Sequence, residues 1–532
     1  MSQMPVNMDV SSGGGYGEIS AISEFYRGRE ILITGGTGFI GKVLVEKLLR
    51  SCPHLSKIYL IIRSKKGKDV RQRLNELLNA SIFDNIKKQQ PEQLGKVIAV
   101  PGDITLPDLG LSNGDQAMLT ENVSIVFHSA ATVKFDEALK PSVAMNLLGT
   151  KRIVQLCQKL SKLEALIHVS TAYCNCNMEV VMEQIYPPPA RPEEIIHCIE
   201  NMDEKILDTI TPQIIGDRPN TYTYTKALAE TVLLEMNGEL PIAIVRPSIV
   251  TAAWREPLAG WVDNLNGPTG LFVGAGKGVL RTLLCHKDYI TDLIPVDIVI
   301  NVMIAVAWKT ATSRQKKLMV YNCTTGVSNP IYWRDVERLI KESILMRPCE
   351  NVIWYPGGSF KGSRFFNSIC VALSHLLPAY LMDACTRIAG RKPIMVTVQN
   401  KLLRAAECLE FFTTHEWKFT NTNVLKLYES LPPSDRESFN FNVNDVNWQE
   451  YMQLYWLGIR RFILKEDTSN DSAARSRLRK VYWIHRISQL VLFLLVWRLL
   501  MFRSQTMSSA WFSLFKFVTQ ISRLLLSQLS IR

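Results

Sequence analysis

A short apolar segment, a glycine-rich turn and a helix start follow one another near the beginning of this 532-residue chain. Residues 29–49 read REILITGGTGFIGKVLVEKLL, in which residues 31–34 are expected to form a strand and Phe39 to begin a helix. Glycines at such a turn let the backbone approach a pyrophosphate, and the helix N-terminus stabilises its charge. The segment therefore predicts a dinucleotide-binding unit. The expected cofactor contacts are Thr34, Gly35, Gly36, Thr37, Gly38, Phe39, Ile40 and Gly41.

The end of the second predicted strand indicates which dinucleotide is bound. Residues 58–62 form that strand, and Arg63 follows it. Enzymes that use NAD usually carry an acid there, roughly 20 residues past the turn, to bind the ribose hydroxyl. Residues 57–68 contain no acid but include Arg63, Lys65 and Lys66. Cations at this place favour the 2′-phosphate, so we predict NADPH.

The same glycine turn also matches the phosphate-binding loop of nucleoside triphosphatases over residues 36–42. That loop needs a hydroxyl after its lysine to bind magnesium, and Val43 stands there instead. The dinucleotide interpretation is therefore preferred.

Apolar strands alternate with helical patterns from about residue 29 to about residue 300. This alternation predicts an α/β fold, a doubly wound parallel sheet of the Rossmann type covered on both faces. We assign residues 24–350 to this domain, with an insertion over residues 174–220 that could cover a substrate pocket. The strands are expected at residues 31–34, 58–62, 97–100, 125–128, 166–170 and 242–246.

Three other regions complete the predicted organisation. Residues 1–23 are polar and glycine-rich, so we expect them to be disordered. A linker is expected over residues 348–362, followed by a smaller, mostly helical domain over residues 365–466. Residues 475–532 are basic and apolar and are expected to form a helical tail.

The tail carries most of the formal net charge of +12. It holds ten basic residues and no acid, which leaves the rest of the chain with 51 basic and 49 acidic residues. A nearly neutral body argues against nucleic-acid binding. Within the tail, residues 487–497 read ISQLVLFLLVW, and residues 511–526 form a second amphipathic stretch. Apolar residues flanked by cations predict membrane attachment, whether by spanning the bilayer or by lying in its interface.

The cysteines and the N-terminus indicate the compartment. Eleven cysteines are scattered through the chain, as in a reducing environment. Cys174 and Cys176 lack a second nearby pair of ligands, so no metal site is predicted. The first residues contain no apolar run typical of a secretory signal. We expect a body that faces the cytosol.

A tyrosine and a lysine one helical turn apart are the predicted catalytic pair. Tyr222 and Lys226 lie in YTYTK and would share one helix face. A nearby ammonium stabilises a phenolate and lowers its pKa, which suits proton exchange with a carbonyl oxygen. Lys226 is also a candidate contact of the cofactor ribose. Such spacing is common in helices, so the interpretation depends on the dinucleotide turn that precedes it.

Further candidates follow predicted strands, whose carboxyl ends are where ligands bind in such sheets. Ser170 and Thr171 are expected to bond the substrate oxygen, Thr171 foremost, and Asn146 to brace Lys226 through water. Asp103 would meet the adenine, Ala130 and Ala131 would line the cofactor, and Pro247, in Arg246–Pro247–Ser248, would touch the nicotinamide. The loop with Gly274, Gly276 and Gly278, near Lys277 and Arg281, is a candidate for phosphates of the substrate.

Several strings resemble known families. TGGTGFIG, YTYTK, HVSTAY, RPSIV and PVD resemble the extended short-chain dehydrogenases/reductases, and IIGDRPNTYTYTKALAE, NGPTGLFVGAGKG, VYNCTTG and YWLGIRRFILKE resemble the alcohol-forming fatty acyl-CoA reductases. The resemblance covers nearly all of the chain from about Phe25. It implies an NADPH reductase domain, a helical "male sterility" domain and often a membrane-attached end.

The resemblance also implies a reaction. Long-chain acyl-CoA would be reduced to an alcohol and coenzyme A by two hydride transfers through an aldehyde, with the product entering a bilayer. The expected location is the endoplasmic reticulum or peroxisome membrane, and a homo-oligomer stays open. Two alternatives remain at this point: a sterol or aldehyde dehydrogenase with the same fold, and a membrane-tethered nucleotide-binding scaffold without activity.

Overall fold

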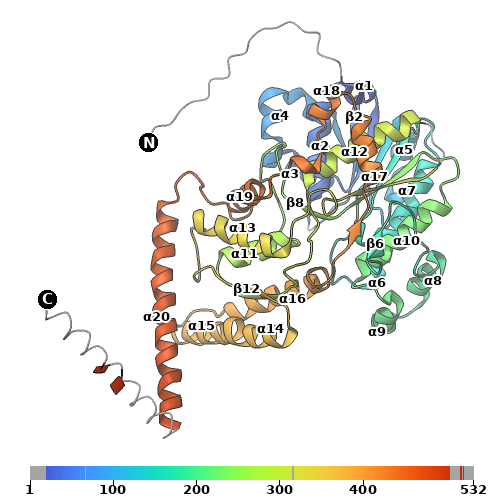
Figure 1. The fold of residues 1–532 in the computed structure, drawn as a ribbon. Coiled ribbons are helices and arrows are strands. Elements are labelled where there is room, and N and C mark those ends of the chain that lie inside the picture. Colours follow the sequence, from blue (N-terminus) through green and yellow to red (C-terminus); the bar gives the residue numbers. More distant parts are fainter. Residues whose placement is uncertain (1–19, 66, 314–316, 504–515, 518, 521–532) are drawn as a thin grey trace, which may run out of the picture.

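The computed structural model describes residues 20–65, 67–313, 317–503, 516–517 and 519–520. Its centre is a seven-stranded parallel sheet in the order β11-β7-β5-β4-β1-β2-β3 (Figure 1). Each of the six expected strands is present, and β11 is a seventh. The strands are β1 (Glu30–Thr34), β2 (Lys57–Ile62), β3 (Val97–Pro101), β4 (Val123–His128), β5 (Ala165–Val169), β7 (Ile242–Pro247) and β11 (Met319–Cys323).

The strand β11 was not expected, because the sheet was predicted to end before it. It pairs with β7, Met319 beside Ala243 and Cys323 beside Pro247. Its sequence, MVYNC, is short and has no strong alternation. This strand therefore forms because it pairs with the free edge of β7, and the local sequence pattern alone does not predict it.

Alternate residues of the strands enter two separate cores, which explains the doubly wound arrangement. Ile31 and Ile33 pack with α2 (Phe39–Ser51) and α12 (Val296–Ser313). Leu32 faces the opposite side, with α5 (Asn113–Asn122), α7 (Gly149–Cys157) and α10 (Thr221–Glu235). The helix α12 is long and apolar enough to cross a membrane, but its residues lie mostly inside the protein. It is a core helix.

The register of the strands brings the functional ends together. Thr34 at the end of β1 pairs with His128 at the end of β4, and His128 pairs with His168 of β5. Residues that follow these strands therefore meet at one edge of the sheet. The remaining helices of the N-terminal part are α1 (Ala21–Phe25), α3 (Val70–Leu78), α4 (Asp84–Gln89), α6 (Leu139–Ser142), α11 (Pro268–Gly276) and α13 (Trp333–Met346).

The insertion over residues 174–220 connects the two halves of the chain. It contains β6 (Val180–Val181), α8 (Pro192–Asn201) and α9 (Glu204–Ile215). The strand β6 pairs with β13 (Lys418–Phe419) of the C-terminal part. Figure 1 shows α8 and α9 at the edge of the body, beside α6 and α10.

The C-terminal part is helical, as expected, but it shares its core with the reductase domain. Tyr451, Tyr455 and Trp456 are buried, and Tyr451 Oη donates to the carbonyl of Ala252 at 2.7 Å. The predicted helical domain therefore packs against the reductase domain through a common hydrophobic core. Its helices are α14 (Arg364–Val371), α15 (Leu377–Ile388), α16 (Met395–Thr414), α17 (Thr422–Glu429), α18 (Pro433–Ser438), α19 (Trp448–Gly458) and α20 (Ser472–Arg503).

Two boundary predictions are also corrected. The expected linker contains β12 (Ser359–Lys361), which pairs with β9 (Thr282–Leu284), because its backbone finds a partner in the body. A second short pair joins β8 (Ile249–Thr251) and β10 (Leu293–Pro295). The end of the expected disordered extension is ordered: Ser20 caps α1 and donates to Asp435, and Ile22 is fully buried. Residues 1–19 and most of the stretch 511–526 lie outside the described residues.

Candidate active site

The glycine turn has the geometry expected of a dinucleotide site. It joins β1 to α2, and Gly35 has φ +74°. A Cβ on Gly35 would lie 2.8 Å from the backbone nitrogen of Ala130, and one on Gly41 would overlap the carbonyl of Gly35. The backbone is therefore drawn tightly around the start of α2. The alternative of a triphosphatase loop is not supported, since Lys42 pairs with Asp263 at 2.8 Å.

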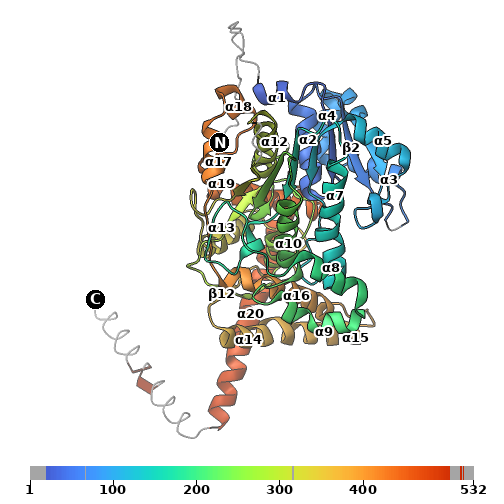
Figure 2. The ribbon, with the colours of Figure 1, turned by 90° about the vertical axis from the view of Figure 1, so that its right-hand side faces the viewer.

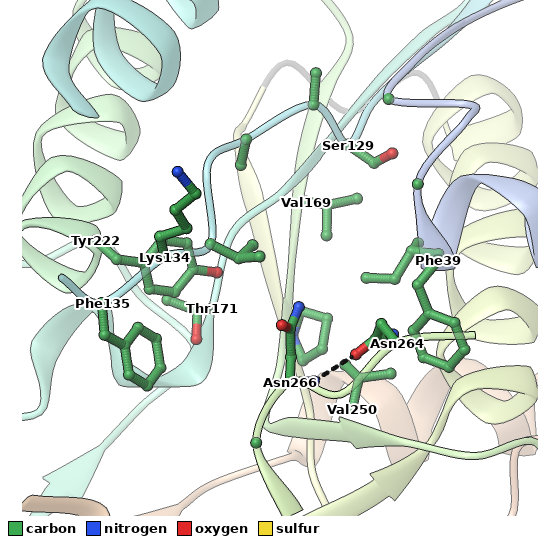
Figure 3. Close-up of a pocket in the computed structure, with 18 of the residues that line it drawn as sticks. Phe39, Ser129, Lys134, Phe135, Val169, Thr171, Tyr222, Val250, Asn264 and Asn266 are labelled. Carbon is green, nitrogen blue, oxygen red and sulfur yellow. Dashed lines mark hydrogen bonds between the residues drawn. The ribbon is translucent and has the colours of Figure 1, made fainter. Parts of the chain in front are cut away.

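A cavity of about 1040 Å³ lies along the carboxyl edge of the sheet, beside this turn. Figure 3 shows Tyr222 and Thr171 on one wall and Phe39 with Asn264 on the opposite wall. Most of the predicted site residues line the cavity. They are Thr34, Gly35, Thr37, Gly38, Phe39, Ile40, Gly41, Arg63, Asp103, Ala130, Ala131, Ser170, Thr171, Tyr222, Lys226 and Pro247. Gly36 is outside this set, since the Leu60 side chain covers it.

Three basic residues line one end of the cavity. Arg63 forms an ion pair with Asp103 at 3.2 Å, and Lys65 lies nearby in the lining. Arg73, on α3, donates to Thr37 Oγ1 at 3.0 Å and to the carbonyl of Arg63. Sequence reasoning missed Arg73, although a basic residue one helix beyond the second strand was the available signal. Burial and the nearby Arg63 lower the pKa of Arg73.

Tyr222 lies at the first turn of α10, which Asn220 caps by accepting from Thr223 N at 2.9 Å. Its side chain lies on the same cavity wall as Thr171, and its ring stacks on Phe135 with centroids 5.9 Å apart. Thr171 itself follows β5 and accepts from Tyr173 N. The hydroxyls of Tyr222, on α10, and Thr171, after β5, thus line the same part of the cavity wall.

Lys226 follows Tyr222 by one turn and is 2% exposed. Its ammonium donates to the carbonyl of Val169 at 2.7 Å. Burial lowers the pKa of Lys226 to about 8, and the carboxylate of Glu230 acts in the opposite direction. The chain therefore holds a cation inside the cavity wall at neutral pH.

The structure does not show the predicted lowering of the Tyr222 pKa by Lys226. Burial raises the pKa of Tyr222 above its usual range, and the nearby hydroxyl of Thr171 acts in the opposite direction. Because the ammonium is engaged with Val169, it does not act as the dominant influence on the phenol. The prediction that Lys226 lowers the pKa of Tyr222 is therefore wrong for the cofactor-free structure.

Asn146 is placed by a short π-helical segment, Val143–Leu148. Its Oδ1 accepts from Thr132 N at 2.9 Å, and its Nδ2 donates to Thr225 Oγ1 at 3.0 Å. It holds the loop after β4 against α10 rather than lining the cavity. A role on Lys226 through water stays a prediction.

Pro247 and Ser248 line the cavity, whereas the neighbouring Arg246 forms a buried pair with Glu230. The candidate glycine loop at residues 274–278 is not part of the cavity lining, and its two cations are engaged with other parts of the protein. Lys277 pairs with Glu466 at 3.3 Å, and Arg281 donates to the carbonyl of Tyr355 at 2.6 Å.

The wall opposite the sheet comes from α16, which sequence reasoning did not assign to the site. Phe412 lies 5.1 Å from Tyr173 and 5.2 Å from Phe135, between ring centroids. None of residues 174–220, all of them described, lines the cavity. The expected covering insertion is therefore corrected: α16 covers the site. Its lining residues are Lys401, Arg404, Ala405, Cys408, Leu409, Phe412 and Thr413.

Comparison with known proteins agrees with this architecture. Residues 33–303 match a family model described as male sterility protein, and residues 374–466 match a second model of that description. Fatty acyl-CoA reductase 1 of Xenopus laevis is 44% identical over 92% of this chain and 96% of its own length. The chain belongs to the fatty acyl-CoA reductase family. Within this family, fatty acyl-CoA reductase 1 of Homo sapiens is 41% identical over 92% of this chain and 96% of its own length, and fatty acyl-CoA reductase 2 of Mus musculus is 42% identical over 94% and 97%.

Solved structures support the fold of this fatty acyl-CoA reductase. The terminal R domain from the myxalamid PKS-NRPS pathway has a TM-score of 0.52 at 18% identity, covering 84% of this chain and 93% of that domain. A reductase (R) domain of a non-ribosomal peptide synthetase from Mycobacterium tuberculosis has a TM-score of 0.53 at 16% identity, covering 82% and 92%. The likeness shows that this chain shares its fold with these reductase domains.

Proposed function

We propose that this protein reduces long-chain fatty acyl-CoA to fatty alcohol and free coenzyme A, with two molecules of NADPH and an aldehyde between the two steps. The single observation that carries the proposal is the cavity, in which Tyr222, Thr171 and Lys226 lie beside the glycine turn. Relatives that align over more than nine-tenths of the chain bear the name fatty acyl-CoA reductase.

The residues present fit NADPH. The turn at Gly35 leaves no room for a Cβ, as close backbone approach to a pyrophosphate requires. Arg63 and Arg73 lie where a ribose 2′-phosphate would be held, and charged hydrogen bonds to phosphate are stronger than neutral ones. Bound NADPH would supply the hydride for each step.

The chain's own residues would act on the substrate oxygen. As hydride reaches the thioester carbon, negative charge develops on the carbonyl oxygen, and Tyr222 and Thr171 are placed to donate hydrogen bonds to it. The carbon–sulfur bond then breaks and releases the thiolate of coenzyme A, whose thiol pKa of about 8.5 makes it a good leaving group. Tyr222 would protonate the alkoxide that the second reduction of the aldehyde produces.

Cations on α16 suit the other end of the substrate. Lys401 and Arg404 are exposed and lie on the cavity wall. Coenzyme A carries phosphates, so exposed cations at a cavity rim are expected to hold it outside while the acyl chain enters. These residues replace the corrected glycine loop as candidates for coenzyme A.

Membrane attachment by α20 is part of the proposal. The first half of α20 contacts the body: Arg477 donates to the carbonyl of Val352 at 3.0 Å, and His485 accepts from Trp354 at 3.0 Å. The apolar residues from Ile487 to Val496 are about half exposed or more on every side. Apolar residues exposed all around a helix are stable in a bilayer and costly in water. A cytosol-facing body on the endoplasmic reticulum or peroxisome membrane fits this arrangement.

Product analysis tests the proposed function. The purified full-length protein in vesicles is incubated with NADPH and acyl-CoAs of graded length, with a sterol and a free aldehyde in parallel. We expect fatty alcohol from long-chain acyl-CoA, and turnover of the sterol alone would overturn the proposal. Tyr222→Phe should lower kcat by roughly 10²–10⁴-fold, as loss of general acid catalysis does. The same variant should bind NADPH normally in a fluorescence titration, and unchanged turnover would contradict the role of Tyr222.

A further inference from the structure

The helix pair α14–α15 presents apolar side chains to its surroundings. Residues 364–388 form a continuous helical stretch that contains an 18-residue window of mean hydropathy 1.5, of which only 11% is buried. Phe365 is 70% exposed and Ile388 is 88% exposed. The exposed apolar positions follow helical spacing along one face, defined here as the outer face: Phe365, Phe366, Ile369, Leu373, Leu377, Tyr380, Leu381 and Ile388.

Three polar side chains of the same helices are hydrogen-bonded on the opposite side, to β9, to the residue before it and to the start of α16. Asn367 accepts from Thr282 Oγ1 at 2.7 Å, and His375 accepts from Arg281 N at 2.7 Å. Asp383 accepts from the backbone nitrogens of residues 394–396, between 2.8 and 3.0 Å. A water-exposed helix normally has the opposite polarity. The arrangement therefore fits surroundings less polar than water.

The charges next to the outer face are of one sign. Residues 384–406 contain no acid but carry Arg387, Arg391, Lys392, Lys401 and Arg404. Such a cluster beside an apolar surface matches anionic phospholipid headgroups. A second protein copy would need acidic groups to match it.

The direction of α20 agrees with one membrane plane. Figures 1 and 2 both show α14 and α15 running across the lower end of the body, while α20 passes beside them and continues beyond. The part that continues holds the apolar residues Ile487 to Val496. A bilayer that receives this part of α20 would have its surface at the level of α14 and α15.

From these observations we propose that the outer face of α14–α15 is a second membrane contact, lying in the plane of the bilayer interface, and that the acyl chain enters the cavity from this side. The inward hydrogen bonds of Asn367 and His375 hold the helices against β9, so they lie on the membrane rather than cross it. This inference rests on the proposed function only for its second half, the entry of the acyl chain.

The helix α16 connects this surface to the cavity. It follows α15 directly, begins beside Asp383, and lines the cavity with Lys401, Cys408 and Phe412. An acyl chain that moves from the bilayer past α16 would reach Tyr222 without entering water. The coenzyme A phosphates would stay near the cations of α16.

Photo-crosslinking tests the membrane contact in the full-length chain. A p-benzoylphenylalanine replaces Leu373 on the outer face, and in a matched control it replaces Leu234, which is 52% exposed at the end of α10 remote from Tyr222. Both proteins are placed in vesicles of about four parts phosphatidylcholine to one part phosphatidylserine. We expect a phospholipid adduct at position 373 and none at 234. A crosslink to a second copy of the chain, or no lipid adduct at 373, would overturn the proposal.

Paired substitutions test the entry route. The double variant Leu373→Glu, Leu381→Glu keeps α20 and the cavity unchanged, with Leu234→Glu as control. We expect several-fold slower reduction of vesicle-bound palmitoyl-CoA by the double variant, and unchanged reduction of water-soluble octanoyl-CoA. Equal rates with palmitoyl-CoA would overturn the entry route. If no acyl-CoA were reduced by the unaltered protein, the proposed function would fail, while the lipid adduct would still decide the membrane contact.

Discussion

At the scale of single residues, Tyr222 and Lys226 lie one helical turn apart yet contact different partners. The phenol meets Thr171, and the ammonium meets the carbonyl of Val169. The spacing in the sequence was enough to place both on one wall of the cavity. It did not reveal the partner of Lys226, because that depends on a strand-end carbonyl that only the folded sheet provides.

The pKa of Lys226 leads to a prediction about pH. Burial lowers this pKa to about 8, so the ammonium is present below that pH and is lost above it. If the proposed mechanism needs the cation, kcat/KM should fall as the pH rises through about 8. Lys226→Arg keeps its charge and should remove this falling limb at a lower overall rate. A falling limb that is the same in the arginine variant would contradict the assignment.

Arg63 and Arg73 lead to a prediction about the cofactor. Arg63→Ala should raise KM for NADPH about 10- to 100-fold, as loss of a charged hydrogen bond worth roughly 1.5–3 kcal/mol implies. KM for NADH should change little, since NADH has no 2′-phosphate. Arg71→Ala is the control, because Arg71 is an exposed arginine of α3, two residues before Arg73 and outside the cavity lining. An equal rise in KM for NADPH and NADH would contradict the assignment of Arg63 to the 2′-phosphate.

At the scale of elements, the glycine turn and the strands around it could be predicted because their signals are local. Residues 31–34 and Phe39 were expected as strand and helix start, and β1 and α2 confirm them. The role of α16 could not be predicted, since its cavity residues are far from the turn in sequence. The insertion was the nearer candidate for a cover, but its strand pairing with β13 directs it elsewhere.

Close packing of α19 against the reductase domain leads to a prediction about stability. A Cβ on Gly458 would overlap the carbonyl of Gly260, which has φ +77° and little freedom to move. Gly458→Ala should therefore lower the free energy of unfolding by roughly 1–3 kcal/mol, as overpacking does. Denaturant unfolding measures this change.

The control for that experiment is Gly114→Ala in α5, where only Ser112 Oγ lies within 4 Å of the added Cβ, at 3.9 Å. This variant should be neutral or up to roughly 1 kcal/mol more stable, because alanine favours helices over glycine. Loss of stability in both variants alike would show that the α19 contact has no special weight.

At the scale of the whole molecule, one body carries a nucleotide site at the sheet edge and apolar surfaces on α14, α15 and α20. The tail was expected to attach the protein because its charge and apolar runs are visible in the sequence. The outer face of α14–α15 was not expected, because the polar residues between its apolar ones gave no sign of pointing inward. Their partners, Thr282 and the backbone nitrogen of Arg281, come from a distant strand and the residue before it.

The most direct test of the central claim counts NADPH oxidised per molecule of alcohol formed. Purified full-length protein in vesicles is given a limiting amount of palmitoyl-CoA, while absorbance follows NADPH and chromatography follows alcohol, aldehyde and coenzyme A. A reduction of thioester to alcohol at one site predicts two NADPH for each alcohol and each coenzyme A. One NADPH for each coenzyme A, with aldehyde accumulating, would contradict it.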